Sequence, residues 1–158
     1  MLKVVKLVPH AILPTVGHPG EDLGYDVFAS EDTVLPLGVT VAVPTGISAH
    51  YAHPELHRKF GLLIKDRSSM AAKGIKTSAG VVDAGYTGEL KVLMTNTSEK
   101  PIRTSPVVFL ERGSYLIEAG SKIAQMIPTE VFTQGQVIEV SELGESSRGG
   151  DGFGSTGI

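Results

Sequence analysis

The stretch of sequence that decides the fold is Gly80-Val-Val-Asp-Ala-Gly-Tyr-Thr-Gly-Glu-Leu90. Two valines end an apolar run, Ala84-Gly85 has the pattern of a two-residue turn, and alternating apolar residues resume at Leu90. The pattern predicts a β-hairpin with Asp83 and Tyr86 near its bend. Taken alone, this hairpin leaves two interpretations open: the two side chains serve the turn and its packing, or they are functional.

Short β-like runs lie on both sides of this hairpin and predict an all-β chain. Proline, glycine and polar residues separate them, which is typical of a barrel or sandwich. The expected strands cover residues 2–8, 33–43, 46–49, 60–64, 90–95, 107–110, 114–117, 123–128 and 136–140. One short helix is expected over residues 69–73, ended by Gly74, and a second helical turn is considered at Pro54.

The composition of the 158-residue chain predicts a single domain with a real core, since 41% of its residues are hydrophobic. No apolar run reaches the roughly 20 residues of a membrane span, so we expect a soluble cytoplasmic protein with no membrane partner. The absence of cysteine excludes disulfides, thiolate metal sites and cysteine nucleophiles. The net charge of -3 argues against general nucleic-acid binding.

The last residues differ from the rest, so we divide the chain into a β-rich core over 1–141 and a flexible glycine-rich arm over 142–158. A lone aromatic, Phe153, in a mobile glycine frame suggests that the arm closes over something. Residues 152–157 match the pattern G-x-G-x-x-G, but the strand and helix that a dinucleotide fold needs around it are missing. Glycines and hydroxyls here can still wrap phosphates, with Arg148 supplying positive charge.

A second candidate site lies at the start of the short helix, where Arg67, Ser68 and Ser69 offer a guanidinium, two hydroxyls and backbone N–H groups to an anion. The alternative is a serine helix cap with Arg67 paired to Asp66. Three histidines at positions 50, 53 and 57 have spacings that metal sites use. Because Pro54 breaks a helix between them, solvated loop histidines are the favoured interpretation.

Five segments occur in order along the chain and together resemble the five motifs of the trimeric dUTPases. They are Asp22-Leu-Gly-Tyr-Asp-Val-Phe-Ala29, Asp66-Arg-Ser-Ser-Met-Ala-Ala-Lys-Gly74, Gly80-Val-Val-Asp-Ala-Gly-Tyr-Thr-Gly88, Gly120-Ser-Lys-Ile-Ala-Gln-Met-Ile127 and Arg148-Gly-Gly-Asp-Gly-Phe-Gly-Ser-Thr-Gly157. The resemblance implies a jelly-roll-like (β-clip) subunit in a homotrimer whose active sites are built from all three chains. It also implies hydrolysis of dUTP to dUMP and pyrophosphate with Mg²⁺, which keeps uracil out of DNA and supplies dUMP for dTMP synthesis.

The resemblance assigns the hairpin its roles. Asp83 is expected to orient and deprotonate the attacking water, and Tyr86 to pack on the deoxyribose and exclude a 2′-hydroxyl. The backbone of Val81, Val82 and Asp83, with the strand leaving through Lys91, is expected to read the uracil edge.

The other motifs are expected to handle the phosphates and the metal. Gln125 is expected at the α-phosphate as the second catalytic residue, and Asp26 is expected to hold Mg²⁺ through water. The remaining expected substrate contacts are Arg67, Ser68, Ser69 and Thr77 from the core, Phe153 stacking on uracil, and Arg148, Gly154, Ser155 and Thr156 from the arm.

The chain departs from the family pattern at four places. Asp66 stands where proline is usual, Ser69 where glycine is common, and Thr77 where many relatives carry asparagine. The segment between Asn96 and Gly120 is longer than usual, and its residues 103–118 resemble an added hairpin to which the sequence assigns no role.

Two other functions compete with dUTP hydrolysis as interpretations of these motifs. A dCTP deaminase shares the Arg-Ser-Ser run and the hairpin, but Leu93 stands where its catalytic glutamate is expected, and leucine cannot shuttle protons. A non-catalytic nucleotide-binding relative is disfavoured because Asp83, Gln125 and the arm are all present.

Overall fold

The computed structural model describes residues 1–158 except 54, 56–57, 99–112, 134 and 145–158. The described part is almost entirely β, which confirms the predicted fold class. Its elements are β1 (Leu2–Lys6), β2 (Tyr25–Phe28), β3 (Thr33–Leu35), β4 (Thr40–Pro44), β5 (Ile47–Tyr51), β6 (Phe60–Asp66), α1 (Ser68–Ala71), β7 (Ile75–Ser78), β8 (Val81–Val82), β9 (Lys91–Asn96), β10 (Tyr115–Ile117) and β11 (Lys122–Glu130).

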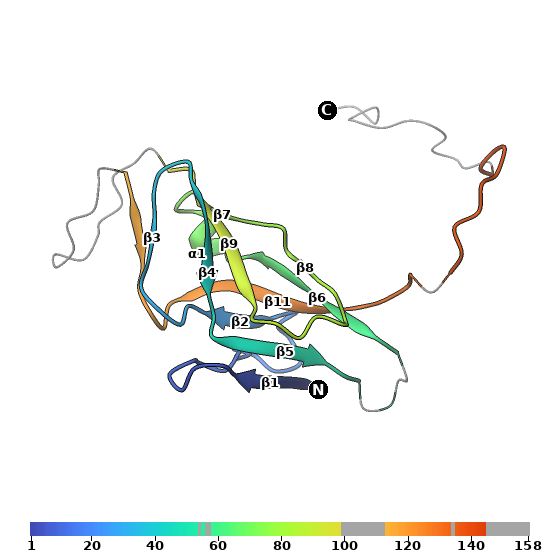
Figure 1. Cartoon of the computed structure of the whole chain (residues 1–158), viewed down its shortest axis with the longest axis horizontal. Helices are drawn as coiled ribbons and strands as arrows, with labels where there is room; N and C mark the ends of the chain where they lie inside the picture. Colours follow the sequence, from blue (N-terminus) through green and yellow to red (C-terminus); the bar gives the residue numbers. More distant parts are fainter. Residues whose placement is uncertain (54, 56–57, 99–112, 134, 145–158) are drawn as a thin grey trace.

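The strands form antiparallel sheets, of which two carry the site (Figure 1). The larger has the order β2-β11-β6-β8 and the smaller the order β4-β9-β7. Two short pairs, β1 with β5 and β10 with β3, complete the described part. Every pairing between these strands is antiparallel, as expected for a jelly-roll-like fold built from hairpins and longer returns.

The core lies between the inward faces of these sheets. The alternating residues of β9, for example, bury Val92 and Met94 and leave Lys91 exposed. Buried side chains from both main sheets belong to one hydrophobic cluster, among them Val27, Ile64, Ile75, Met94 and Met126. Side chains from opposite sheets therefore hold the strands in place, and the strand ends and connections remain free to carry chemistry.

Most strand predictions are confirmed, with instructive exceptions. The expected strand over 33–43 is two strands, since Gly38, with φ of 75°, turns the chain between β3 and β4. Residues 136–140 were predicted as a strand and are loop, which is a wrong prediction. The helix occupies Ser68–Ala71 and not 69–73, and Gly74, with φ of 77°, ends the turn as predicted.

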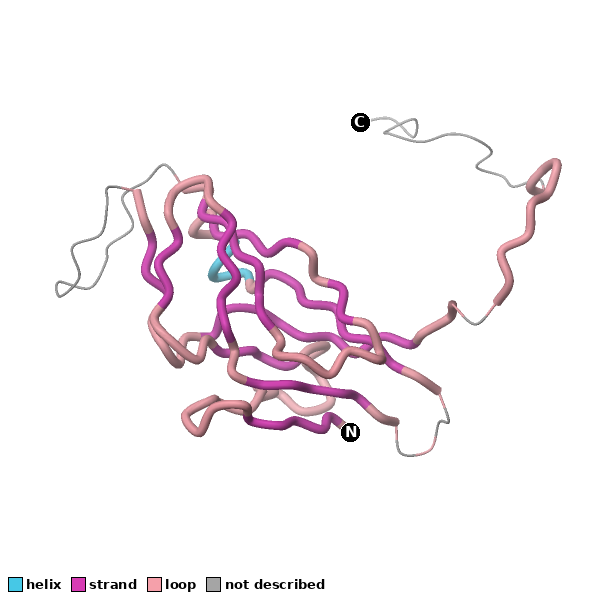
Figure 2. The backbone as a smooth tube through the Cα atoms, in the orientation of Figure 1, coloured by secondary structure: helices cyan, strands magenta, loops and turns pink. Residues whose placement is uncertain are grey.

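Two strands, β2 and β7, were missed by the sequence analysis, whereas β8 coincides with the two valines of the predicted hairpin. The expected strand at 107–110 and the helical turn at Pro54 lie outside the described residues. Within the described part of the chain, no helix is long and apolar enough to span a bilayer. After β11 the chain leaves the body of the protein as an extended loop, which Figure 2 shows running away from the sheets.

Candidate active site

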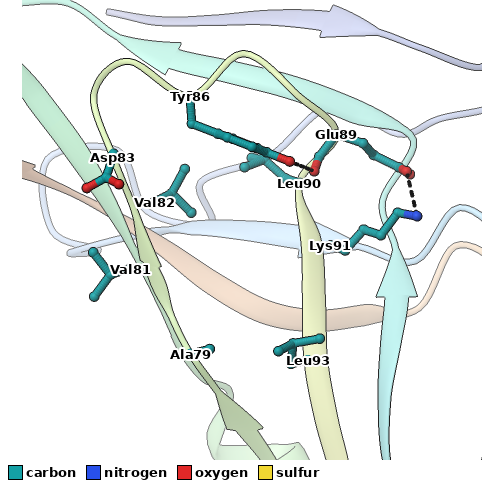
Figure 3. A pocket seen from close by; sticks show the side chains of 9 residues that line it. All are labelled: Ala79, Val81, Val82, Asp83, Tyr86, Glu89, Leu90, Lys91 and Leu93. Carbon is teal, nitrogen blue, oxygen red and sulfur yellow. Dashed lines mark hydrogen bonds and ion pairs between the residues drawn. The ribbon is translucent and has the colours of Figure 1, made fainter.

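A hollow is formed by the connection that follows β7. It has a volume of about 580 Å³, within the range of small-molecule sites. We call it the Asp83 hollow and define it by its lining residues, which are Ala79, Val81, Val82, Asp83, Tyr86, Glu89, Leu90, Lys91 and Leu93. In Figure 3 the β8 residues and Asp83 stand on one side of the hollow, and Glu89 to Leu93 stand on the other.

The turn of this connection is the one predicted, but the strand pairing around it is not. The Tyr86 N–H donates to the Asp83 carbonyl at 3.0 Å, so Ala84-Gly85 does form the two-residue turn. The flanking strands do not pair with each other, however: β8 pairs with β6, and β9 pairs with β4 and β7. The predicted simple hairpin is therefore wrong, and the connection instead spans two sheets and opens a hollow between them.

Gly80 makes this divergence possible. The Ile64 N–H donates to the Gly80 carbonyl at 2.6 Å, and a Cβ on Gly80 would lie 2.1 Å from the Ile64 carbonyl oxygen. No side chain fits such a contact, so only glycine lets the chain cross from β7 to the edge of β6 here.

Tyr86 is held in place although it is 48% exposed. Its hydroxyl donates to the Glu89 carbonyl at 3.0 Å. Its ring lies over Gly88, where an added Cβ would stand 2.5 Å from the tyrosine hydroxyl oxygen. One face of a fixed aromatic ring therefore remains available to a ligand in the hollow.

Glu89 organises the hollow and was not predicted from the sequence. Its Oε1 accepts the Gly46 N–H at 3.0 Å, and its Oε2 lies 3.4 Å from Lys91 Nζ. The carboxylate thus ties the connection to the start of β5 and orients the lysine beside it. The one available signal was the two-residue spacing, which places both side chains on the same face of an extended chain.

A second group of functional side chains lies at the far end of β6. We call it the Arg67 cluster and define it as Asp26, Arg67, Ser69, Lys122 and Gln125. Arg67 Nε donates to Asp26 Oδ1 at 3.0 Å, and Lys122 Nζ lies 2.7 Å from Asp26 Oδ2. Arg67 also donates to Ser69 Oγ at 2.9 Å. Of the two interpretations left open for Arg67, the pairing with Asp66 is therefore wrong.

Strand register brings these residues together. Asp26 lies in the interior of β2 opposite Gln125 of β11, which in turn faces Lys65 of β6. The Asp26 side chain is only 12% exposed, yet both of its oxygens are ion-paired. Two cations against one carboxylate leave the cluster with an excess positive charge, which suits an anionic ligand. Lys122 is the cluster member that sequence reasoning missed.

The residues at positions 66 and 77, which both depart from the family pattern, contact each other. Asp66 Oδ1 accepts the Thr77 N–H at 2.6 Å and also the Thr77 hydroxyl. The two substitutions, which look independent in the sequence, join the last residue of β6 to β7. Ser68 lies exposed at the first turn of α1.

The Arg67 cluster and the Asp83 hollow lie at opposite ends of β6. Val82 pairs with Leu62, near the start of the strand, whereas Arg67 follows its last residue. Five residues of extended chain separate Leu62 from Arg67, which is about 16 Å. One copy of the chain therefore does not bring Asp83 and Arg67 to the same atom of a ligand.

The described residues contain no group of three or more His, Cys, Asp and Glu side chains that could hold a metal ion. His50 lies exposed on β5, His53 stacks on Phe60 with centroids 6.3 Å apart, and His57 lies outside the described residues. Asp26 offers one carboxylate that is already ion-paired. That donor set fits a Mg²⁺ ion that keeps its waters and binds mainly to a ligand's phosphates.

The arm residues predicted to contact substrate, Arg148, Phe153, Gly154, Ser155 and Thr156, lie outside the described residues. In the segment 103–118, to which the sequence assigns no role, the structure describes only β10 (Tyr115–Ile117) and the residues beside it. β10 pairs with β3.

Comparisons with known proteins agree over nearly the whole chain. The family model described as dUTPase matches residues 10–157. The deoxyuridine 5'-triphosphate nucleotidohydrolase of Paramecium bursaria Chlorella virus 1 is 40% identical over 158 residues, covering 99% of this chain and 98% of its own. The dUTPase of Staphylococcus bacteriophage 80alpha, solved with dUPNHPP, superposes with a TM-score of 0.81 at 30% identity, covering 100% of this chain and 99% of its own. A mutant dUTPase of phage phi11 of S. aureus, which reveals the coordination of a structural Mg(II) ion, has a TM-score of 0.75 at 27% identity, covering 90% of this chain and 97% of its own.

Proposed function

The chain belongs to the dUTPase family, and from that premise we propose how its residues share the hydrolysis of dUTP to dUMP and pyrophosphate. The deaminase alternative is not favoured. Leu93 lines the hollow at the position where a proton-shuttling glutamate would be needed.

Asp83 acts as the general base. Its carboxylate is exposed at the turn, beside the hollow, where it can accept a proton from water. The water oxygen attacks the α-phosphorus, its proton passes to Asp83, and the bond from the α-phosphorus to the bridging oxygen breaks. Pyrophosphate then leaves and dUMP remains.

The hollow selects the nucleoside. In the described structure β8 is the edge strand of its sheet and pairs only with β6. The backbone N–H and C=O groups of residues 81–83 that point away from β6 are therefore available to the edge of a base. Uracil and cytosine differ in these donors and acceptors, and a mismatched pair would be left unsatisfied. Tyr86 packs against the deoxyribose, and Lys91, oriented by Glu89, stands at the opposite wall.

The Arg67 cluster binds the triphosphate. Arg67, Ser68 and Ser69 donate to phosphate oxygens, Gln125 stands at the α-phosphate, and Lys122 adds positive charge. Asp26 holds Mg²⁺ through water. When bound, the cation neutralises charge that develops on the phosphates.

The enzyme is a homotrimer with shared active sites. Since the Arg67 cluster and the Asp83 hollow of one chain are separated by the length of β6, a neighbouring copy must supply one of them. The extended segment after β11 exposes several apolar side chains, which suit a surface covered by another copy. These are Phe132, Val137, Ile138, Val140 and Leu143. The arm, with Phe153, Arg148, Gly154, Ser155 and Thr156, closes the site.

The observation that carries this proposal is the dUTPase match over residues 10–157, with Asp83 and Tyr86 lining the Asp83 hollow. A pyrophosphate-release assay with dUTP, dCTP and UTP tests it. We expect release from dUTP alone, and ammonia release from dCTP would instead support the deaminase. Binding of dUTP without turnover would support the non-catalytic relative.

A further inference from the structure

The contact between Asp66 and Thr77 lies outside the roles assigned above. Asp66 is the last residue of β6 and immediately precedes Arg67, and Thr77 lies in β7. One carboxylate oxygen receives both the backbone N–H and the hydroxyl of the threonine. A charged acceptor with two donors from one residue is a stronger and more directional contact than a single neutral hydrogen bond.

Asp66 and Arg67 point in opposite directions. Arg67 has φ of -82° and ψ of 137°, so the extended conformation of β6 continues through it and the side chains alternate. Arg67 turns toward Asp26 and Ser69, whereas Asp66 turns toward β7. The carboxylate is thereby kept from the guanidinium that would meet the triphosphate.

Met70 anchors α1 in the core, but the start of the helix has no side-chain cap. Arg67 is the N-cap residue and makes no side-chain hydrogen bond to the helix N-terminus. On one side the turn is held by the ion pair of Arg67 with Asp26, and on the other by Asp66 with Thr77. The backbone that presents Arg67, Ser68 and Ser69 is therefore fixed from both flanks.

We propose that Asp66 and Thr77 form a clamp that positions the Arg67–Ser69 turn for the triphosphate, so that Thr77 is a positioning residue and not a substrate ligand. This inference rests on the proposed phosphate-binding role of Arg67. It explains two departures from the family pattern by one contact: an aspartate that could compete for Arg67 is accompanied by a threonine that engages it.

The test uses ligands that contain only one part of the substrate. Calorimetry would measure the binding of tripolyphosphate, which lacks the nucleoside, and of deoxyuridine, which lacks phosphates, while kinetics give KM and kcat for dUTP. We expect Thr77→Val to weaken tripolyphosphate binding and raise KM about threefold, and Asp66→Ala about tenfold, as for loss of one or both charged hydrogen bonds. Deoxyuridine binding and kcat should stay near wild type.

Three further variants make the test specific. Thr77→Ser keeps both donors and should behave as wild type, and the double variant Asp66→Ala/Thr77→Val should be no worse than Asp66→Ala alone. Thr95→Val is the matched control on the neighbouring strand: Thr95 faces Lys76 of β7, and its hydroxyl pairs with the Thr40 hydroxyl at 2.7 Å instead of with Asp66. It should change neither ligand's binding.

Weaker deoxyuridine binding in Thr77→Val would overturn the proposal, because Thr77 would then be a nucleoside contact. Unchanged tripolyphosphate binding, or independent effects that multiply in the double variant, would overturn it as well. Should Asp66→Ala fail to fold, the comparison of Thr77→Val with Thr77→Ser still decides. Failure of the wild-type protein to hydrolyse dUTP would instead refute the proposed function, which keeps the two failures distinct.

Discussion

The Arg67 cluster and the Asp83 hollow each centre on an aspartate, and the two aspartates have opposite surroundings. Asp26 is nearly buried and both of its oxygens are ion-paired. Asp83 is exposed, and in the part of the chain that the structure describes its carboxylate makes no hydrogen bond or ion pair. The first carboxylate is committed to fixed cations, and the second is free to receive a proton.

This difference separates two tasks of phosphoryl chemistry. Binding a triphosphate needs fixed positive charge, and the ion pairs of Asp26 hold Arg67 and Lys122 in place before the ligand arrives. Activating water needs an acceptor whose oxygens are not already held by fixed cations, which Asp83 provides.

Replacing the free carboxylate should have the largest effect on turnover. Asp83→Asn removes the proton acceptor while keeping the size of the side chain, so we expect pyrophosphate release to fall about 10³-fold or more. Binding of dUTP, measured by calorimetry, should persist. Glu21→Gln, a change at an exposed acid outside the site, is the control. Near-normal turnover of Asp83→Asn would remove Asp83 from the base role.

Mixing two inactive variants should restore activity if the two regions meet between chains. Asp83→Asn and Arg67→Ala are each expected to be inactive, and co-refolded trimers would contain sites with an intact Asp83 from one chain and an intact Arg67 from another. Random mixing of equal amounts gives about one quarter of wild-type activity. Each variant refolded alone is the control. No recovery in verified mixed trimers would place both groups in one chain.

Neutralising the ion-paired carboxylate of Asp26 should lower the free energy of unfolding, whereas neutralising the unpaired carboxylate of Asp83 should not. Asp26→Asn leaves Arg67 and Lys122 without their counter-charge. We expect the free energy of unfolding to fall by about 2–3 kcal/mol, less than for a fully buried pair, because both cations are partly exposed. Asp83→Asn should change it little. Chemical denaturation of both variants measures this, and equal stabilities would contradict the distinction.

The smallest effect on activity should come from loosening the Tyr86 ring in the Asp83 hollow. Tyr86→Phe removes the hydrogen bond to the Glu89 carbonyl, and we expect the preference for dUTP over UTP, as the ratio of kcat/KM values, to fall about threefold. Tyr115→Phe is the matched control, since its hydroxyl accepts from Lys73 at 3.1 Å at a distance from the hollow. An unchanged ratio would show that ring packing over Gly88 is sufficient.

The sequence predicted local features of the fold well and pairings poorly. The Ala84-Gly85 turn and the helix stop at Gly74 depend on neighbouring residues, and both are confirmed. That β8 pairs with β6 depends on the close approach of Gly80 to Ile64, which no local pattern contains. Strand β2 was missed because an aspartate in its interior argues against a strand until its distant partners Arg67 and Lys122 are known.

For the candidate site, too, the sequence did not predict contacts between residues that are distant in the chain. Motif order pointed to Asp26, Arg67, Asp83 and Tyr86, which the structure places in the Arg67 cluster and the Asp83 hollow. Glu89 was missed because its partners, Gly46 and Lys91, come together only in the folded chain. Asp66 and Thr77 appeared as separate departures because they are eleven residues apart in the sequence. Only the folded chain shows the hydrogen bond between them.

The place of β11 in the larger sheet sets an order of events during biosynthesis. This strand lies between β2 and β6, yet it spans residues 122–130 of the chain. Until the ribosome has added β11, about a hundred residues after β2, β2 has no partner in this sheet. Its apolar face therefore stays uncovered during most of synthesis. Such non-local closure makes folding slow and leaves the nascent chain exposed to aggregation until translation is nearly complete.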